Sequence, residues 1–98
     1  MAIAEVSIVP VGTATTSVSD FVAGAVSIVQ ASGLRFELTA MGTMIEGELS
    51  TVLETVRKMH ETPFAKGAQR VYTVIKIDDR RDKQTGMDYK VHSVQDKL

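Results

Sequence analysis

Two carboxylates, Glu46 and Glu48, flank a glycine in a segment that alternates apolar and polar residues. Residues two apart on a strand face the same side, so these carboxylates either act together on a ligand or are ordinary exposed strand residues. The hydroxyls of Ser7, Thr39 and Thr43 are expected in the same region of a sheet. Hydroxyls beside a carboxylate and apolar walls suit a flat heteroaromatic ligand, which needs directional bonds at its edge and dispersion on its faces.

A second polar cluster is the segment KIDDRRDK, residues 76–83, which has seven charged side chains in eight residues and follows the apolar run VYTVI. It is either a binding cluster or the solvated end of a strand. Its charges sum to only +1, which argues against a nucleic-acid surface. Arg80 or Arg81 can pair with aspartates of a neighbouring subunit through two parallel hydrogen bonds, so the segment is interpreted as an assembly device. Lys76 alone is expected to reach toward a ligand.

Other chemistries have little support in the sequence. The absence of cysteine excludes disulfides, thiolate metal sites and cysteine nucleophiles. His60 and His92 lack the spacing of a metal site or a catalytic triad, so we expect packing or surface roles for both. The loop GTATT, residues 12–16, either offers backbone amides to an anion or bonds its hydroxyls to its own backbone. We therefore expect no catalytic residue, no metal and no cofactor.

The composition is that of an ordinary globular chain, with 98 residues, 44% hydrophobic and 23% charged, and a net charge of -1. One domain over residues 1–98 is expected, and a partner subunit would help so short a chain to bury apolar surface. The balanced charge predicts no nucleic-acid partner. The apolar opening MAIAEVSIVPVG lacks a basic start and is interrupted by Glu5 and Pro10, which argues against a signal peptide or a membrane span and predicts a cytoplasmic protein.

Hydrophobic periodicity predicts six elements. Alternation indicates strands and a 3.6-residue period indicates helices, and Pro10, Gly12, Gly33, Pro63 and Gly67 mark boundaries. Ser17 with Asp20 approximates a capping box at the start of the first helix. Residues 87–98 are ambiguous: MDYKV is compatible with a strand, and SVQDKL with a short helix capped by Ser93. The predicted strands cover residues 3–11, 34–39, 43–49 and 69–77, and the helices run from 17 to 33 and from 50 or 51 to between 63 and 67.

The order β-α-β-β-α-β predicts an α+β fold, the ferredoxin-like sandwich, with a four-stranded antiparallel sheet and two helices on one face. The chain has no predicted layer for the second face, here called the open face. A face that mixes apolar, carboxylate and lysine side chains suits a subunit interface that also encloses a small ligand. Alternation puts these residues on it: Glu5, Ser7, Val9, Glu37, Thr39, Met44, Glu46, Glu48, Tyr72, Val74 and Lys76.

Three segments together resemble the small thiamine-binding protein family: AEVSIVPVGT, LRFELTAMGTMIEGEL, and VIKIDDRRDK followed by KVHSVQDKL. The resemblance covers essentially the whole chain. It implies the ferredoxin-like fold, homo-oligomers that are dimers or dimers of dimers (tetramers), no catalytic activity, and binding of thiamine or its hydroxymethylpyrimidine portion in some members. Carried over residue by residue, it implies a ligand site at Ser7, Pro10, Thr43 and Glu46, with Lys76 as a further candidate.

The leading hypothesis is a non-enzymatic protein that binds thiamine or hydroxymethylpyrimidine at the open face or a subunit interface. The alternative is an oligomeric structural or regulatory module whose open face serves assembly only. A third reading, an enzyme acting on a thiamine precursor, lacks a nucleophile–base pair in the sequence.

Overall fold

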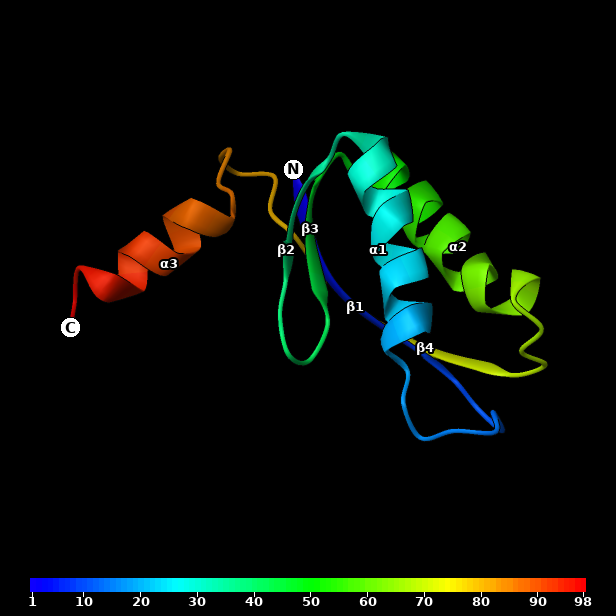
Figure 1. Ribbon diagram of the computed structural model, residues 1–98. Helices are drawn as coiled ribbons and strands as arrows, with labels where there is room; N and C mark the ends of the chain where they lie inside the picture. Colours follow the sequence, from blue (N-terminus) through cyan, green and yellow to red (C-terminus); the bar gives the residue numbers. More distant parts are fainter.

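The computed structural model describes all residues, 1–98, and contains four strands and three helices (Figure 1). The sheet is antiparallel with the strand order β2-β3-β1-β4. Helices α1 and α2 pack on one face of it, so the predicted α+β ferredoxin-like sandwich is confirmed. The elements are β1 Ala2–Pro10, α1 Ser19–Ser32, β2 Arg35–Leu38, β3 Thr43–Gly47, α2 Leu49–Ala65, β4 Val71–Asp79 and α3 Met87–Gln95.

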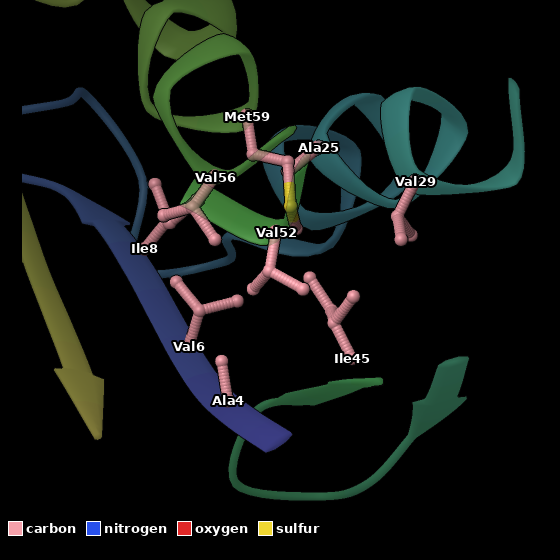
Figure 2. Close-up of a cluster of buried hydrophobic side chains, with 9 residues drawn as sticks. All are labelled: Ala4, Val6, Ile8, Ala25, Val29, Ile45, Val52, Val56 and Met59. Atoms are coloured by element: carbon pink, nitrogen blue, oxygen red, sulfur yellow. The ribbon is translucent and has the colours of Figure 1, made fainter. Parts of the chain in front are cut away.

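The hydrophobic core lies between the sheet and these two helices (Figure 2). Alternate residues of β1 point into it because successive side chains of a strand face opposite sides. Ile45 of β3 and Val29 of α1 are both fully buried. The predicted inner faces of the strands therefore agree with the structure. The core residues are Ala4, Val6, Ile8, Ala25, Val29, Ile45, Val52, Val56 and Met59.

The helix ends differ from the predicted ones in detail. Helix α1 starts after Val18 without a side-chain capping bond, and the Ser17 hydroxyl makes only a long 3.5 Å contact with the Ser19 hydroxyl, so the predicted capping box is wrong. Helix α2 begins at Leu49 and includes Pro63 within its last turns instead of ending there. Both differences fall at helix ends, where local signals decide boundaries only to within a residue or two.

The strands of the sheet differ in length, and this leaves a gap in it. Pairing between β1 and β3 stops at Val6 opposite Thr43, whereas pairing between β1 and β4 continues to Pro10 opposite Val71. The end of β1 therefore has a partner strand on one edge only. We call the gap beside residues 7–10, beyond the start of β3 at Thr43, the sheet notch. A side chain at Gly42 would place its Cβ 2.8 Å from the Val6 carbonyl oxygen, so glycine permits the close approach of the hairpin to β1.

The C-terminal segment forms helix α3, which spans Met87–Gln95. The alternative of a strand over MDYKV is therefore wrong, and the helix begins six residues before Ser93. Figure 1 shows α3 on the side of the sheet opposite α1 and α2, leading away from the sandwich. The radius of gyration is 14.6 Å, above the value of about 13 Å for a compact domain of 100 residues. The open face thus has a partial cover from its own chain, contrary to expectation.

Candidate functional site

A cavity of about 180 Å³ occupies the sheet notch. Its walls are the second half of β1, the hairpin loop of residues 39–42 and the first turns of α1, with Met59 of α2 behind them. Pockets for drug-sized ligands measure about 300–1,000 Å³, so this notch cavity is of a size for one ring with its substituents. Most of the lining is apolar, including Val6, Ile8, Val22, Ala25, Leu38 and Met59.

Two hydroxyl residues predicted for the site, Ser7 and Thr43, both line the notch cavity. Thr43 is 5% exposed and shares the inner face of the sheet with its partner Val6, whereas Ser7 belongs to the opposite face. Neither hydroxyl takes part in a hydrogen bond within the chain. The third hydroxyl of the cavity is occupied, because Thr39 Oγ1 donates to the Gly42 carbonyl at 2.8 Å. Ser7 and Thr43 are therefore the side chains free to bond a ligand there.

Pro10, predicted as a ligand residue, is not part of the lining of this cavity. It is buried at the end of β1, opposite Val71 of β4. Proline has no N–H for a ladder, so it ends the strand where β1 has already lost its other partner.

The predicted residue Lys76 lies in a different hollow, of about 360 Å³, between the open face and the first turns of α3. We call it the α3 hollow. Lys76 Nζ is 3.2 Å from Glu5 Oε1, and on the other side Lys90 of α3 pairs with Asp78. Met44 and Met87 contribute apolar surface between these pairs. The structure thus separates Lys76 from the hydroxyls of Ser7 and Thr43.

Glu46 attaches helix α3 to the sheet. Its Oε1 accepts a hydrogen bond from the Met87 backbone N–H at 2.6 Å, which satisfies one of the free amides of the first helical turn. A carboxylate is also favoured at the positive end of the helix dipole. Gly86 makes this contact possible, because a Cβ there would overlap Glu46 Oε1. Glu46 was predicted as a ligand residue, and in this structure its bonding capacity is largely used within the chain.

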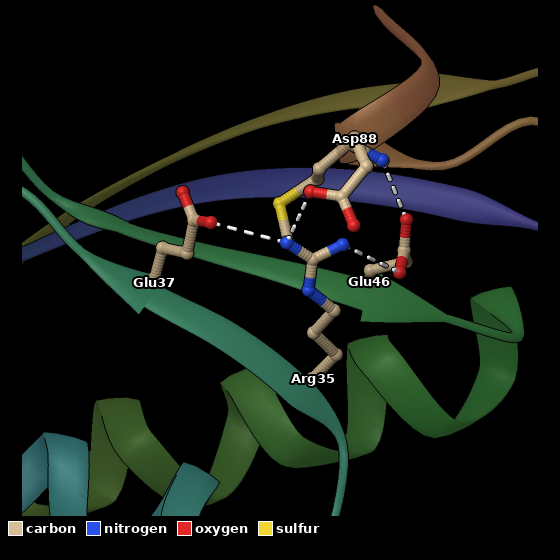
Figure 3. A network of polar contacts seen from close by, with 5 residues as sticks. Arg35, Glu37, Glu46 and Asp88 are labelled. Carbon is tan, nitrogen blue, oxygen red and sulfur yellow. Dashed lines mark hydrogen bonds and ion pairs between the residues drawn. The ribbon is translucent and has the colours of Figure 1, made fainter. Parts of the chain in front are cut away.

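Arg35 completes this attachment (Figure 3). Its guanidinium bonds Asp88 of α3 at 2.8 Å and Glu37 at 3.1 Å, and lies 3.7 Å from the second oxygen of Glu46. The hydrogen bond to Asp88, followed by the negative charges of Asp88, Glu46 and Glu37, raises the pKa of Arg35 above its ordinary value. Sequence reasoning missed Arg35, although a hairpin that pairs Thr43 with Leu38 must also place Arg35 opposite Glu46.

The predicted pair of carboxylates does not form. Strand β3 ends at Gly47, and Glu48 stands at the start of α2, where it accepts a hydrogen bond from the Ser50 hydroxyl at 2.7 Å. Glu46 meanwhile faces α3. The alternation that suggested a shared face stops between the two residues, so the interpretation of Glu46 and Glu48 as a joint ligand site is wrong.

The arginines of the charged segment KIDDRRDK form ion pairs with aspartates of the same segment. Arg80 bonds both oxygens of Asp82, at 2.6 and 3.0 Å, and Arg81 bonds Asp79 at 2.7 Å. The bond from Arg80 lowers the pKa of Asp82 from 3.8 to about 2. These arginines thus find their aspartates two residues away in the same chain, which removes the main reason for assigning them to a neighbouring subunit.

The structure holds no group of three or more histidine, aspartate or glutamate side chains placed to bind a metal ion. None of its helices has both the length and the apolar composition needed to cross a bilayer. The candidate chemistry of the molecule therefore centres on the notch cavity and on the contacts of α3.

The fold and the cavity define a small ferredoxin-like protein with a candidate site for a ligand of ring size. Residues 4–95 match the family described as "Thiamine-binding protein", and the chain belongs to that family. The resemblance noted in the sequence is thereby confirmed.

The chain is 51% identical to the UPF0045 protein YqgV of Bacillus subtilis, over 96% of this chain and 94% of that protein. Among solved structures it resembles hypothetical protein MJ1052 of Methanocaldococcus jannaschii, with a TM-score of 0.88, 35% identity and coverage of 96% and 95% of the two chains. A domain of unknown function, DUF77, from Bacillus cereus has a TM-score of 0.85 and 35% identity, with coverage of 98% and 91%. These relatives support the fold throughout its length.

Proposed function

We propose that this protein binds thiamine or its hydroxymethylpyrimidine portion in the notch cavity, without catalysing a reaction. Membership of the thiamine-binding family supports the ligand class. The observation that carries the location is the pair of hydroxyls, Ser7 and Thr43, that line an apolar cavity and have no hydrogen-bond partner within the chain. No buried side-chain polar atom of the structure lacks a partner, so these two hydroxyls are open to solvent, and a ligand that displaces their water must supply hydrogen bonds in its place.

The cavity suits the pyrimidine end of thiamine. An aminopyrimidine ring presents ring nitrogens that accept and an amino group that donates, and each hydroxyl can do either. The apolar walls from β1, α1 and α2 contact the faces of the ring. Because the cavity measures only about 180 Å³, the thiazolium ring of thiamine would extend outside it, past the hairpin loop.

The lining of the cavity supports binding instead of catalysis. It contains no histidine, lysine or carboxylate, so neither hydroxyl has a base within the cavity to activate it. A hydroxyl without such a base is a weak nucleophile at neutral pH. The groups present can orient a ligand and exclude water from it.

Calorimetric titration with three compounds tests the proposal: hydroxymethylpyrimidine, thiamine, and the hydroxyethylthiazole portion alone. We expect binding of the first two and none of the third, because the pyrimidine ring alone enters the cavity. Absence of heat with hydroxymethylpyrimidine and thiamine at millimolar concentration contradicts the proposal. Binding of the thiazole portion with equal affinity contradicts the orientation of the ligand.

A second candidate function is that of an assembly module, as a dimer or a dimer of dimers. The observation that favours it is the exposed apolar surface of β4, which has no partner strand on its outer edge. Tyr72 and Val74 are exposed on the open face, and Ile75 and Ile77 are exposed on the other. Such edges pair readily with another chain. An oligomer in sedimentation that binds neither hydroxymethylpyrimidine nor thiamine favours this function over the first.

A further inference from the structure

A second hollow, of about 660 Å³, lies at the end of the sheet where β1 finishes and β4 begins. Its walls are residues 11–13 of the β1–α1 loop, residues 66–70 of the α2–β4 loop, and Phe21 of α1. Figure 1 shows the two loops at the same end of the sheet, and the Val11 N–H donates to the Arg70 carbonyl between them at 2.8 Å. We call this space the loop hollow. It shares no lining residue with the notch cavity.

The loop hollow contains two cationic side chains and no carboxylate. Lys66 and Arg70 line it, and its other lining residues are uncharged. Neither cation forms an ion pair within the chain, whereas the four other arginines of the protein all pair with carboxylates. In a chain with a net charge of -1, two cations without a carboxylate beside them form a local positive field that attracts anions.

The ammonium group of Lys66 is held in place beside α1. Its Nζ donates to the carbonyl of Asp20 at 2.9 Å and lies 5.9 Å from the centre of the Phe21 ring. Gly24 leaves room for this position, because a Cβ there would lie 2.7 Å from Nζ. The bond to Asp20 uses one of the three donors of the ammonium group, so two remain for a ligand. Lys66 therefore presents a positioned charge to the loop hollow.

The two loops also supply backbone donors. Their hydroxyls serve the chain itself, since Thr13 Oγ1 donates to the Thr15 carbonyl at 2.8 Å. Phosphate groups in proteins are held by this combination of unpaired backbone amides with lysine and arginine side chains. Four N–H groups of lining residues make no hydrogen bond within the chain, namely those of Gly12, Thr13, Gln69 and Arg70.

We infer that the loop hollow binds the phosphate group of an organic phosphate, with Lys66 and Arg70 as its charged contacts. The guanidinium of arginine matches two phosphate oxygens at once, and the lysine adds a point charge. The hollow is larger than a phosphate group requires, and Val11 and Phe21 add apolar surface for an attached organic group. This site goes beyond the function proposed above, because none of its residues belongs to the notch cavity.

Two sources of the phosphate are compatible with this chemistry. Val9 of the notch cavity and Val11 of the loop hollow are two residues apart, so the phosphate belongs either to a ligand of the notch cavity or to a separate compound. The shared chemistry is the phosphate group, and the experiment begins with that group alone.

NMR titration of the full-length protein with inorganic phosphate and with pyrophosphate, at an ionic strength kept constant with chloride, tests the site. Saturable shifts are expected for the amides of Gly12, Thr13 and Gln69. Lys66→Gln with Arg70→Gln should weaken binding by about tenfold or more, because two charge-assisted hydrogen bonds are lost. The matched control, Lys58→Gln with Lys97→Gln, removes the same charge outside the loop hollow and should leave the affinity unchanged.

Gly24→Ala tests the position of the Lys66 ammonium group without changing the net charge. The new methyl group would displace Nζ, so phosphate affinity should fall severalfold. The fold should persist, because alanine is favoured over glycine within a helix and the end of a lysine side chain moves easily. Unchanged affinity in Gly24→Ala would overturn the role of the positioned ammonium group.

Absence of saturable amide shifts with both anions overturns the inference, and so does equal weakening in the control variant, which would indicate a response to net charge alone. Thiamine monophosphate and thiamine then distinguish the two sources. Tighter binding of the monophosphate, with the gain lost in Lys66→Gln with Arg70→Gln, supports a notch ligand as the source. Equal affinity of the two compounds, in a protein that binds inorganic phosphate at the loop hollow, supports a separate organic phosphate. A protein that binds phosphate there but neither thiamine nor hydroxymethylpyrimidine keeps this site and loses the function proposed above.

Discussion

The carboxylate of Glu46 accepts the backbone N–H of Met87 at 2.6 Å, and this single bond joins β3 to a helix 41 residues further along the chain. The side chain of Glu46 is only 12% exposed. A residue that looked suited to a ligand thus holds the first turn of α3 on the open face, together with Arg35 and Asp88.

Replacing Glu46 by alanine should loosen α3 without unfolding the sandwich. The loss of a side chain that caps a helix start costs about 0.5–2 kcal/mol. Hydrogen exchange should report faster exchange of the α3 amides, with the amides of β1 unchanged. Equal exchange in α3 would contradict this role. Loss of ligand affinity in Glu46→Gln would instead support the carboxylate as a ligand contact.

Removing the two free hydroxyls of the notch cavity should weaken hydroxymethylpyrimidine binding. Ser7→Ala and Thr43→Val each remove one hydrogen bond, worth about 0.5–1.5 kcal/mol, so each should lower the affinity by up to about tenfold in calorimetry. Ser27→Ala is a suitable control, because the Ser27 hydroxyl bonds the Gly24 carbonyl within α1. If both cavity variants bind as the wild type does, the ligand lies elsewhere.

Gly86→Ala should release α3 by a steric route. The new methyl group would overlap Glu46 Oε1 and displace the carboxylate from the Met87 N–H. The expected result is faster proteolysis within residues 83–98, with the thermal unfolding of the sandwich little changed. The control is Gly67→Ala in the α2–β4 loop, where no atom lies within 4 Å of the new Cβ. Alanine strains the turn at Gly67, whose φ is +97°, but this change should leave proteolysis of α3 unaltered.

The hydrogen bond from Arg80 to Asp82 should be measurable as a lowered pKa of the Asp82 carboxyl. Because the bond from Arg80 lowers the pKa of Asp82 from 3.8 to about 2, its contribution to stability is present above pH 3.8 and is lost as the pH falls toward 2. Arg80→Gln should return the pKa of Asp82 toward 3.8 in a carboxyl NMR titration. The lowered pKa of Asp79, which depends first on its bond from Arg81, should stay the same. An unshifted Asp82 in the wild type would contradict the pairing.

The sandwich could be predicted from local patterns because its strands and helices each bury one side. The alternation of Ala4, Val6 and Ile8 and the helical spacing of Val52, Val56 and Met59 both identify a face of the core. The pattern also placed Met44 and Glu46 on the open face, and the register confirms this. The spacing of apolar and polar residues therefore predicts most of the fold.

The arrangement of the site could be predicted only in part. Ser7 and Thr43 were expected to lie near each other, and they do share one cavity. The point at Val6 where β1 stops pairing with β3 and the position of α3 could not be read from periodicity, because they depend on where two segments far apart in sequence stop pairing or meet. Asp88 had no sequence signal for its bond to Arg35, since the course of residues 80–86 was undetermined.

Because β1 is longer than β3, the volume of the notch cavity can vary between proteins of this fold without a change in the core. Residues 39–42 close the hairpin at the mouth of the cavity, outside the packed core. Insertions or deletions there would change the room for a ligand while the buried layer between sheet and helices stayed as it is. Relatives with a longer or shorter hairpin could thus accept larger or smaller molecules on an unchanged scaffold.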